Sequence, residues 1–315
     1  MRSRFLFPAA LAALALPFLV AACGDDNSSG GGGGNLSGTI RIDGSSTVGP
    51  LSEAAAELFR EENPDVRITV GISGTGGGFE KFCAGETDIA DASRAIEQDE
   101  IDACREKDIA YEEVTVANDG LAVVVNPDND WAECLTTAEL KNIWDRGSNV
   151  NNWNQVRDDF PDQGMKLFGA GTDSGTFDYF TEAINGEEGR TRKDYSPTED
   201  DNVTVQGVSG DPGNIGYFGL SYAIANEGKV KTVQVDGGDG CVEPTTETVQ
   251  NGTYQPLGRP LFIYPSAEAL QKEVAREFVQ FYVDNQEAIA EQAQFVPLTE
   301  EQQQEAADKV ARLAG

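Results

Sequence analysis

Three short segments rich in hydroxyl groups and glycine constrain this chain most, because each of them precedes a predicted helix. They are residues 44–50 (GSSTVGP), 74–78 (GTGGG) and 171–176 (GTDSGT). The first amides of a helix have no partner within the helix and lie at the positive end of its dipole, so each segment could bind an anion. One such turn is more often an ordinary helix cap. The recurrence of three favours a fold that gathers helix N-termini around an anion.

Apolar residues at helical spacing follow each turn, and the first two turns come after predicted strands at residues 39–42 and 66–72. In an open α/β sheet, ligands bind beyond the carboxyl ends of the strands, where helix N-termini meet. The three turns could therefore converge on one small anion. The apolar helical positions are Leu51, Ala55, Leu58 and Phe59, then Phe79, Phe82 and Cys83, and finally Phe177, Phe180 and Ile184.

Strand-like and helix-like segments continue to alternate along the chain, which predicts the α/β class. Two apolar segments, residues 120–125 and 260–265, are predicted to be buried strands, and helices are predicted from residue 267 onward. The acidic residues 198–201 lack the regular ligand spacing of a calcium-binding EF-hand, so we interpret them as a solvated turn. About 280 residues after the N-terminal region are enough for two lobes of ordinary domain size.

The N-terminal region has the features of an export signal. Arg2 and Arg4 precede an apolar run that is too short for a membrane span, and the run ends in Val-Ala-Ala-Cys at Cys23. This ending is similar to a bacterial lipobox, in which cleavage precedes the cysteine and its sulfur receives a diacylglycerol; an ordinary signal peptide is the alternative. We predict a signal peptide over residues 1–22, then a lipidated Cys23 and a flexible Gly/Ser linker to residue 37. The protein would then be extracytoplasmic and anchored to the cell membrane by its lipid.

Four cysteines remain once Cys23 is assigned to the lipid. An even number in an exported chain suggests two disulfides, for which three pairings are possible. We predict that Cys83 pairs with Cys104 and Cys134 with Cys241, because the first two are close in sequence and each pair would then lie within one lobe. Unpaired buried thiols are the alternative. No metal is expected, because the chain has no histidine and no Cys-x-x-Cys motif.

The charge of the chain is strongly acidic, with 54 Asp and Glu against 23 Lys and Arg and a formal net charge of −31. This balance argues against nucleic acid as a partner. It says little about a small ligand, because a buried site is governed by its nearest amides and charges. An acidic protein can therefore still bind an anion.

Four motifs in order along the chain resemble those of the phosphate-binding lipoproteins, PstS-like proteins that feed ABC importers. The motifs are residues 43–50 (DGSSTVGP), 87–94 (TDIADASR), 171–177 (GTDSGTF) and 259–264 (RPLFIY). The resemblance covers the chain from residue 38 to the C-terminus. It implies the periplasmic-binding-protein fold, type II-like, with two α/β lobes, two crossover strands and the ligand in the cleft between the lobes.

Lobe I would then comprise residues 38–121 and 261–315, and lobe II residues 122–260. The apolar strands near Val123 and Phe262 would be the crossovers. The resemblance also implies a set of phosphate-binding residues that come from the three turns. They are Ser46, Thr47, Thr75, Gly76, Ser174, Gly175 and Thr176.

One departure from the family pattern concerns the arginine. The best-known branch has Asp after Ala-Ser and an Arg four positions before Ser-Gly-Thr, whereas this chain has Arg94 and Ala170 at those places. We therefore predict that Arg94 makes two charged hydrogen bonds to phosphate. The alternative role for Arg94 is a surface ion pair.

The departure leaves the carboxylate that distinguishes phosphate from sulfate unassigned. Phosphate near neutral pH carries a proton and sulfate carries none, so a buried carboxylate can accept a hydrogen bond from phosphate and repel sulfate. Asp91 lies three residues before Arg94, and Asp119 leads into a crossover strand. Either could be the proton acceptor, and either could instead be a cap or turn residue. Asp173 is predicted to cap the helix of the third turn.

The function predicted from these observations is binding without catalysis. A monomer would capture inorganic phosphate, close its lobes and deliver the ion to the permease subunits of an ABC importer, with no cofactor. Another tetrahedral oxyanion such as sulfate, molybdate or tungstate is the first alternative, and phosphate sensing or adhesion is a further one. An exported serine hydrolase using Ser46 or Ser174 is less favoured, because the chain has neither a histidine base nor a Gly-x-Ser-x-Gly motif.

Overall fold

The computed structural model describes residues 36–172 and 174–314, all within the unit Asn35–Gly315. The predicted signal peptide, Cys23 and almost all of the predicted linker lie outside the described residues, as does Asp173. A nine-stranded sheet runs through the unit in the order β2-β1-β3-β12-β4-β8-β6-β7, with β9 paired to β4. Among the described helices, none is long and apolar enough to cross a membrane.

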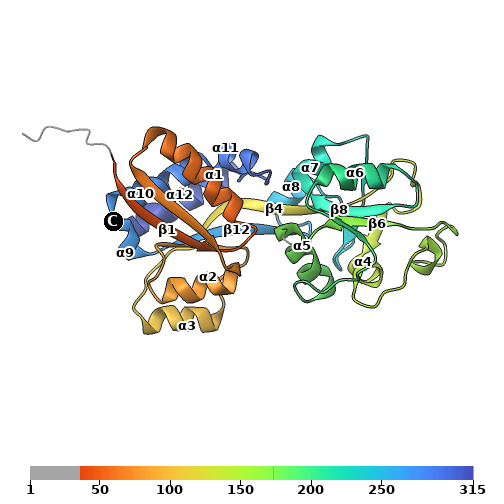
Figure 1. Ribbon diagram of the computed structural model, residues 1–315, viewed down its shortest axis with the longest axis horizontal. Helices are drawn as coiled ribbons and strands as arrows, with labels where there is room; N and C mark the ends of the chain where they lie inside the picture. Colours follow the sequence, from red (N-terminus) through yellow and green to blue (C-terminus); the bar gives the residue numbers. More distant parts are fainter. Residues whose placement is uncertain (1–35, 173, 315) are drawn as a thin grey trace, which may run out of the picture. The chain divides into compact units, whose positions relative to one another are not determined.

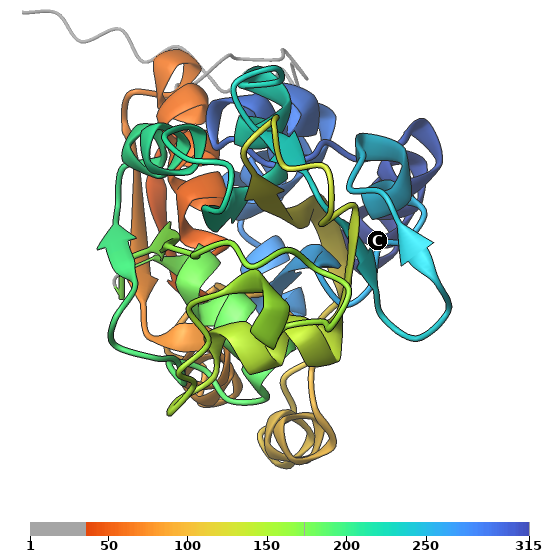
Figure 2. The same cartoon turned by 90° about the vertical axis from the view of Figure 1, so that its right-hand side faces the viewer.

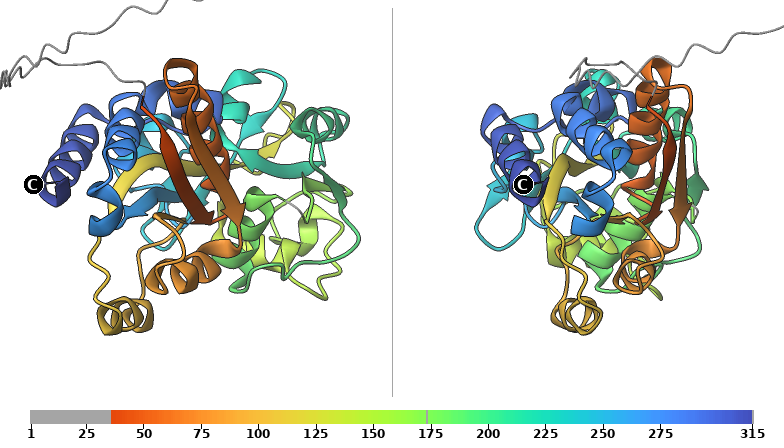
Figure 3. Two further views of the ribbon diagram at one scale, coloured as in Figure 1. Left: turned by 60° about the vertical axis from the view of Figure 1, so that its left-hand side comes forward. Right: turned by 90° about the vertical axis from the view of Figure 1, so that its left-hand side faces the viewer.

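The first half of the sheet falls within the predicted lobe I. Strand β1 (Gly38–Gly44) pairs in parallel with β2 (Val66–Ile72) and with β3 (Ile89–Ala92). The helices of this part are α1 (Gly49–Glu62), α2 (Gly74–Cys83) and α3 (Gln98–Glu106), followed near the C-terminus by α9 (Ala267–Leu270), α10 (Glu273–Asp284), α11 (Gln286–Gln292) and α12 (Glu300–Ala314). Helix α3 lies beside α2, at the bottom of the views in Figures 1 and 3.

The second half of the sheet falls within the predicted lobe II, which faces the viewer in Figure 2. Strand β6 (Leu167–Ala170) pairs in parallel with β7 (Ser196–Thr198) and β8 (Ile215–Gly219). A small sheet joins β5 (Cys134–Thr136), β10 (Gln234–Asp236) and β11 (Cys241–Val242). The remaining elements are β9 (Lys231–Thr232), α4 (Thr137–Trp144), η1 (Trp153–Gln155), α5 (Gly175–Phe180), η2 (Thr181–Asn185), α6 (Asp201–Ser209), α7 (Leu220–Ala225) and α8 (Thr246–Gln250).

Two central strands join the halves, as predicted for the crossovers. Strand β4 (Val114–Val125) runs antiparallel to β12 (Gly258–Pro265), and the two lie side by side in Figure 1. Strand β12 also pairs with β3, and β4 also pairs with β8. All of β4 except Thr115 is buried, which explains its nearly continuous apolar sequence.

The buried apolar side chains of the described residues form three clusters. One gathers residues of the predicted lobe I, with edge-to-face contacts from Phe59 to Phe278 and Phe281. A second gathers mainly residues of the predicted lobe II around Trp144, Phe180 and Tyr217, where the last two rings stack with centroids 3.8 Å apart. A small third cluster joins α2 to β3 and β12. The residue boundaries of the two lobes stay a prediction, which this separation of the cores supports.

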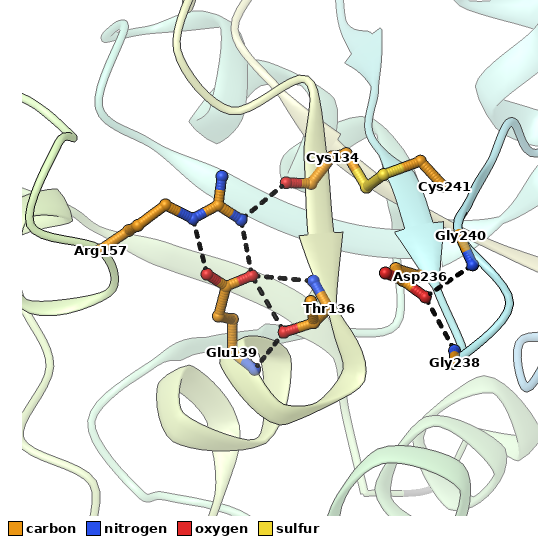
Figure 4. The surroundings of a disulfide bond; sticks show 8 residues. All are labelled: Cys134, Thr136, Glu139, Arg157, Asp236, Gly238, Gly240 and Cys241. Carbon is orange, nitrogen blue, oxygen red and sulfur yellow. Dashed lines mark hydrogen bonds and ion pairs between the residues drawn. A yellow bond between two sulfur atoms is a disulfide. The ribbon is translucent and has the colours of Figure 1, made fainter.

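Both predicted disulfides are confirmed. Cys83 and Cys104 are joined with their Cα atoms 4.3 Å apart, which ties α3 to α2. Cys134 and Cys241 are joined across the small sheet, with Cα atoms 6.0 Å apart. Figure 4 shows the second bond, near the ion pair between Arg157 and Glu139 that stabilises the start of α4.

The glycine-rich turn at residues 74–78 differs from the prediction. The helix does not start at Phe79: α2 already begins at Gly74, where φ is +77°, a left-handed value that favours glycine. A Cβ added at Gly78 would lie 2.5 Å from the Cα of Gly44. The glycines therefore allow α2 to pack closely against the end of β1.

Three further segments are defined more closely by the structure. The acidic residues 198–201, predicted to be a solvated turn, are exposed or partly exposed, and Asp200 is the N-cap of helix α6. Residues 120–125, predicted to be a buried strand, are the end of the longer strand β4 because burial continues along it. Strands β9 and β10 are close in sequence but pair with different partners, β4 and β5.

Candidate functional site

A cavity of about 290 Å³ lies where the first two turns meet lobe II and the crossover strand β12. A larger cavity of about 940 Å³ lies elsewhere in lobe II, but none of the three turns lines it. The lining of the smaller cavity is almost entirely polar. It consists of Ser45, Ser46, Thr47, Ser73, Gly74, Thr75, Gly76, Gly77, Ser93, Arg94, Asp178, Tyr179, Glu182, Glu188 and Arg259.

Ser45, Ser46 and Thr47 of the first turn all line the cavity, and the hydroxyl of Ser45 is used within the turn itself. The hydroxyl of Ser45 accepts hydrogen bonds from the amides of Thr47 and Val48, over 3.2 and 3.4 Å. Ser46 instead donates to the carboxylate of Asp178 on α5, over 3.3 Å. This bond joins lobe I to lobe II across the cavity.

The second turn supplies the N-terminus of α2. The N-cap residue Ser73 makes no side-chain cap hydrogen bond, so its hydroxyl does not occupy the first amides of the helix. Thr75 accepts a bond of 3.2 Å from the amide of Ser93, and the two hydroxyls lie 3.0 Å apart. Gly76 also lies in the cavity wall.

The third turn lies next to the cavity without lining it. Ser174 is the N-cap of α5, and its hydroxyl accepts from the amide of Thr176 over 3.2 Å. A Cβ added at Gly175 would lie 2.7 Å from Oγ1 of Thr47. The third turn therefore packs directly against the first, and Ser174 takes the N-cap position that was predicted for Asp173.

Arg94 lines the cavity, but its terminal nitrogens are already paired. Nη1 and Nη2 each donate to a carboxylate oxygen of Glu100 over 2.8 Å, and Nε lies 3.3 Å from Glu97. The hydrogen bond to Glu100 raises the pKa of Arg94, which keeps the guanidinium charged. The two nitrogens of Arg94 that were predicted to bind phosphate therefore bind Glu100 in this structure.

Arg259 is the cavity arginine to which sequence reasoning gave no role. Its side chain is 14% exposed, and Nε donates to Oδ2 of Asp119 over 3.3 Å. Nη2 donates to Oγ1 of Thr47 over 3.2 Å, and the guanidinium lies 3.5 Å above the ring of Tyr179. The residue stood in a quoted motif, but its position opposite Asp119 depends on strand register, which the sequence does not reveal.

The two predicted proton acceptors lie behind the cavity wall. Asp91 is completely buried and faces the core between α1 and α10, where Ser52 donates to it over 2.9 Å. Burial raises the pKa of Asp91 to about 8. Asp119 is buried against Arg259; burial raises its pKa, and the arginine only partly offsets this. Neither carboxylate lines the cavity.

Asp178 is the carboxylate that lines the cavity and receives a hydroxyl from lobe I. Burial raises the pKa of Asp178, and the hydrogen bond from Ser46 and the charge of Arg259 offset this only in part. Glu182 and Glu188 also line the cavity. Sequence reasoning missed Asp178 because an aspartate in the first turn of a helix is common for electrostatic reasons alone.

Comparison with known proteins identifies the family. The family model for the PBP superfamily domain matches residues 29–286. The chain belongs to the PBP superfamily. This membership agrees with the α/β sheet and the two crossover strands described above.

Members of the superfamily with high similarity cover most of the chain. Protein SphX of Synechococcus elongatus is 50% identical over 82% of this chain and 77% of its own length. The phosphate-binding protein PstS of Staphylococcus saprophyticus is 36% identical over 96% of this chain and 93% of its own. A crystal structure of a possible phosphate binding protein from Planctomyces limnophilus is 45% identical, with a TM-score of 0.86, and covers 89% of this chain and 100% of its own.

Proposed function

We propose that this protein is the solute-binding component of a phosphate ABC importer, which binds inorganic phosphate with high affinity and delivers it to the permease subunits. The observation that carries the proposal is the convergence of two arginines, several hydroxyls and the free N-terminus of α2 on one small polar cavity. Oxygen-rich anions are bound by such donors. The relatives whose names state phosphate binding support this choice of anion.

The proposed phosphate ligands are the hydroxyls of Ser46, Thr47 and Thr75, the amide of Gly76, and Arg94 through the donors that Glu100 leaves. Ser174, Gly175 and Thr176 form a second group. They stand behind Thr47 in this structure, so we propose that they reach the ion only when the two turns separate slightly to admit it. The contact between Gly175 and Thr47 supports a cleft that is nearly closed here.

Asp178 replaces Asp91 and Asp119 as the proposed acceptor of the phosphate proton. Its carboxylate lines the cavity, whereas those of Asp91 and Asp119 do not. Sulfate, which has no proton to donate, would face repulsion from Asp178 without compensation. Phosphate is therefore favoured over sulfate, molybdate and tungstate.

The proposed role is binding without catalysis. The hydroxyl of Ser46 donates to the carboxylate of Asp178, which makes no ion pair with the described residues, and Ser174 serves as a helix cap. Lys81, the lysine on α2, is paired with Asp43 over 2.6 Å. In the described part of the chain, no group of three or more acidic or cysteine side chains is placed to hold a metal ion. A serine hydrolase is therefore the weaker hypothesis.

The proposal places the protein outside the cytoplasmic membrane as a lipid-anchored monomer with no affinity for nucleic acid. Cys23 would carry the lipid, and the linker would hold the binding unit off the membrane. Changing Cys23 to Ser should release the protein from membranes and leave phosphate affinity unchanged. A Cys23→Ser protein that stays in the membrane fraction would show that the lipobox assignment is wrong.

Calorimetric titration tests the binding function directly. The chain from residue 24 onward, stripped of bound anions, is titrated with phosphate and with sulfate near pH 6 and near pH 8. We expect phosphate binding and no sulfate response, and Asp178→Asn should raise sulfate affinity relative to phosphate. Tight sulfate binding by the unmodified protein would reassign the ligand to another oxyanion.

A further inference from the structure

The two crossover strands carry an arginine–aspartate pair at the cavity wall. Arg259 on β12 and Asp119 on β4 are direct partners in the antiparallel register. Their side chains are 14% and 6% exposed, and the ion pair measures 3.3 Å. A charge pair buried this deeply costs desolvation free energy, and an equally packed apolar pair would often be at least as stable. Stability alone therefore does not explain why a charged pair occupies this position.

The guanidinium of Arg259 is held from three directions. Asp119 holds Nε from β4, and Thr47 accepts from Nη2 at the start of α1. Tyr179 on α5 lies under the guanidinium plane at 3.5 Å, and its hydroxyl is tied to the carbonyl of Pro256 over 2.8 Å. Lobe I, lobe II and the crossover strands all fix one side chain, so its orientation is set before a ligand arrives.

This arrangement leaves donors of Arg259 available. A guanidinium has five N–H donors, and within the described residues Nη1 of Arg259 makes no hydrogen bond and Nη2 makes one. At Arg94, in contrast, both terminal nitrogens pair with Glu100. The side chain with the freer donors is therefore the one on the crossover strand.

We propose that Arg259 is the principal cationic ligand of the anion and that Asp119 is its positioning residue. The inference rests on the proposed function of phosphate binding in this cavity. Its consequence is that the anion binds directly to the strands that join the lobes, as well as to the turns of each lobe. Asp119 then acts through Arg259 and accepts no proton from the ligand.

The first experiment compares phosphate affinity in matched arginine variants by calorimetry. Arg259→Ala should weaken binding on the order of 10- to 100-fold, the range for a hydrogen bond to a charged group. Arg259→Lys keeps the charge without the planar two-pronged geometry and should restore only part of the loss. Arg190→Ala is the matched control, because Arg190 makes an ion pair of 2.6 Å with Asp145 away from the cavity, and its affinity should equal that of the wild type.

A second measurement does not depend on how Arg259→Ala folds. The side-chain Nε–Hε NMR signal of Arg259 is assigned by its absence from Arg259→Lys, and the wild-type protein is then titrated with phosphate. We expect this signal to shift with saturation of the site. In Asp119→Asn the signal should broaden through faster exchange with water and phosphate affinity should fall, while the amide spectrum stays that of a folded protein.

The outcomes separate the inference from the function. If the wild type binds phosphate while Arg259→Ala binds equally well, or the Arg259 signal does not move, the inference is wrong and the proposed function stands. If the wild type does not bind phosphate at all, the proposed function itself fails. A loss in Arg259→Ala together with a shifted signal in the wild type supports both.

Discussion

Arg94 and Arg259 line the same cavity, but the structure holds them in different ways. Arg94 is 33% exposed and has both terminal nitrogens on Glu100, within lobe I. Arg259 is 14% exposed and uses Nε for Asp119, which leaves Nη1 unbonded among the described residues. Lining the cavity is therefore not enough to make an arginine available to an anion. What matters is how many of its N–H donors are not already bonded to neighbouring carboxylates.

Two buried carboxylates near the cavity, Asp119 and Asp91, also differ in their partners. Asp119 is buried beside an arginine, whereas Asp91 is buried with one hydrogen bond from Ser52 and an Oδ2 atom that has no partner in the described structure. An ion pair can keep a buried carboxylate charged, but a single hydroxyl is a poor substitute. Burial therefore favours the neutral form of Asp91, whose pKa is raised to about 8.

The largest expected effect is the difference between the two arginine variants. Arg259→Ala should cost ~1.5 to 3 kcal/mol of phosphate binding free energy. Arg94→Ala should cost less than ~1 kcal/mol, because both terminal nitrogens of Arg94 already pair with Glu100 and its side chain is partly exposed. Calorimetry on both variants measures the difference. Equal losses would mean that the two arginines contribute equally to phosphate binding. A larger loss for Arg94→Ala would mean that Arg94 is the main cationic ligand.

The close packing of the first and third turns predicts that a larger residue at position 175 lowers phosphate affinity. Gly175→Ala would place a Cβ 2.7 Å from Oγ1 of Thr47, the residue that accepts from Arg259. Crowding of this kind costs ~1 to 3 kcal/mol, so phosphate affinity should fall about tenfold. Gly219→Ala is the control, because a Cβ there would meet no atom within 4 Å. Wild-type affinity in Gly175→Ala would mean that the turns separate far enough in the bound state to accommodate the added Cβ.

A pH experiment separates Asp91 from Asp119. Burial raises the pKa of Asp91 from 3.8 to about 8, so between these values the folded protein binds more protons than the unfolded chain. The free energy of unfolding should therefore fall as pH rises through this window, by at most ~1.4 kcal/mol per pH unit.

Asp91→Asn should remove that part of the slope. Urea unfolding of both proteins at about pH 5 and about pH 7.5 gives the comparison. Parallel pH dependence in the two proteins would show that Asp91 is ionised in the folded state. Asp119, beside Arg259, should contribute a shallower slope than Asp91.

The smallest expected effect comes from releasing Arg94. Glu100→Gln keeps the shape of the side chain and removes the charge that holds both terminal nitrogens. Because partly exposed ion pairs contribute ~0.2 to 1 kcal/mol, phosphate affinity should rise by at most about fivefold. A drop in affinity would indicate that Glu100 positions Arg94 for the ligand.

The residues predicted from the first two turns line the cavity, whereas two charged residues of its wall were not assigned from the sequence. Ser46, Thr47, Thr75 and Gly76 all lie in the cavity wall, because hydroxyl and glycine patterns at helix starts are local features of the chain. Asp178 and Arg259 were not assigned, because each acquires its role from partners that are distant in sequence. Asp91 was chosen for its closeness to Arg94 in sequence, but successive residues of a strand point to opposite faces.

Much of this protein was therefore decided by the sequence alone: the α/β class, the helices and most strands, the two disulfide pairings and the turns rich in hydroxyl groups and glycine. These follow from short-range periodicity, from the chemistry of helix ends and from a few cysteines with few possible pairings. Only the tertiary structure decided which charges meet. The register of β4 against β12 places Asp119 opposite Arg259, 140 residues away in the sequence. Charge pairing depends on distances of a few ångströms between segments far apart in the chain, and no local pattern encodes those distances.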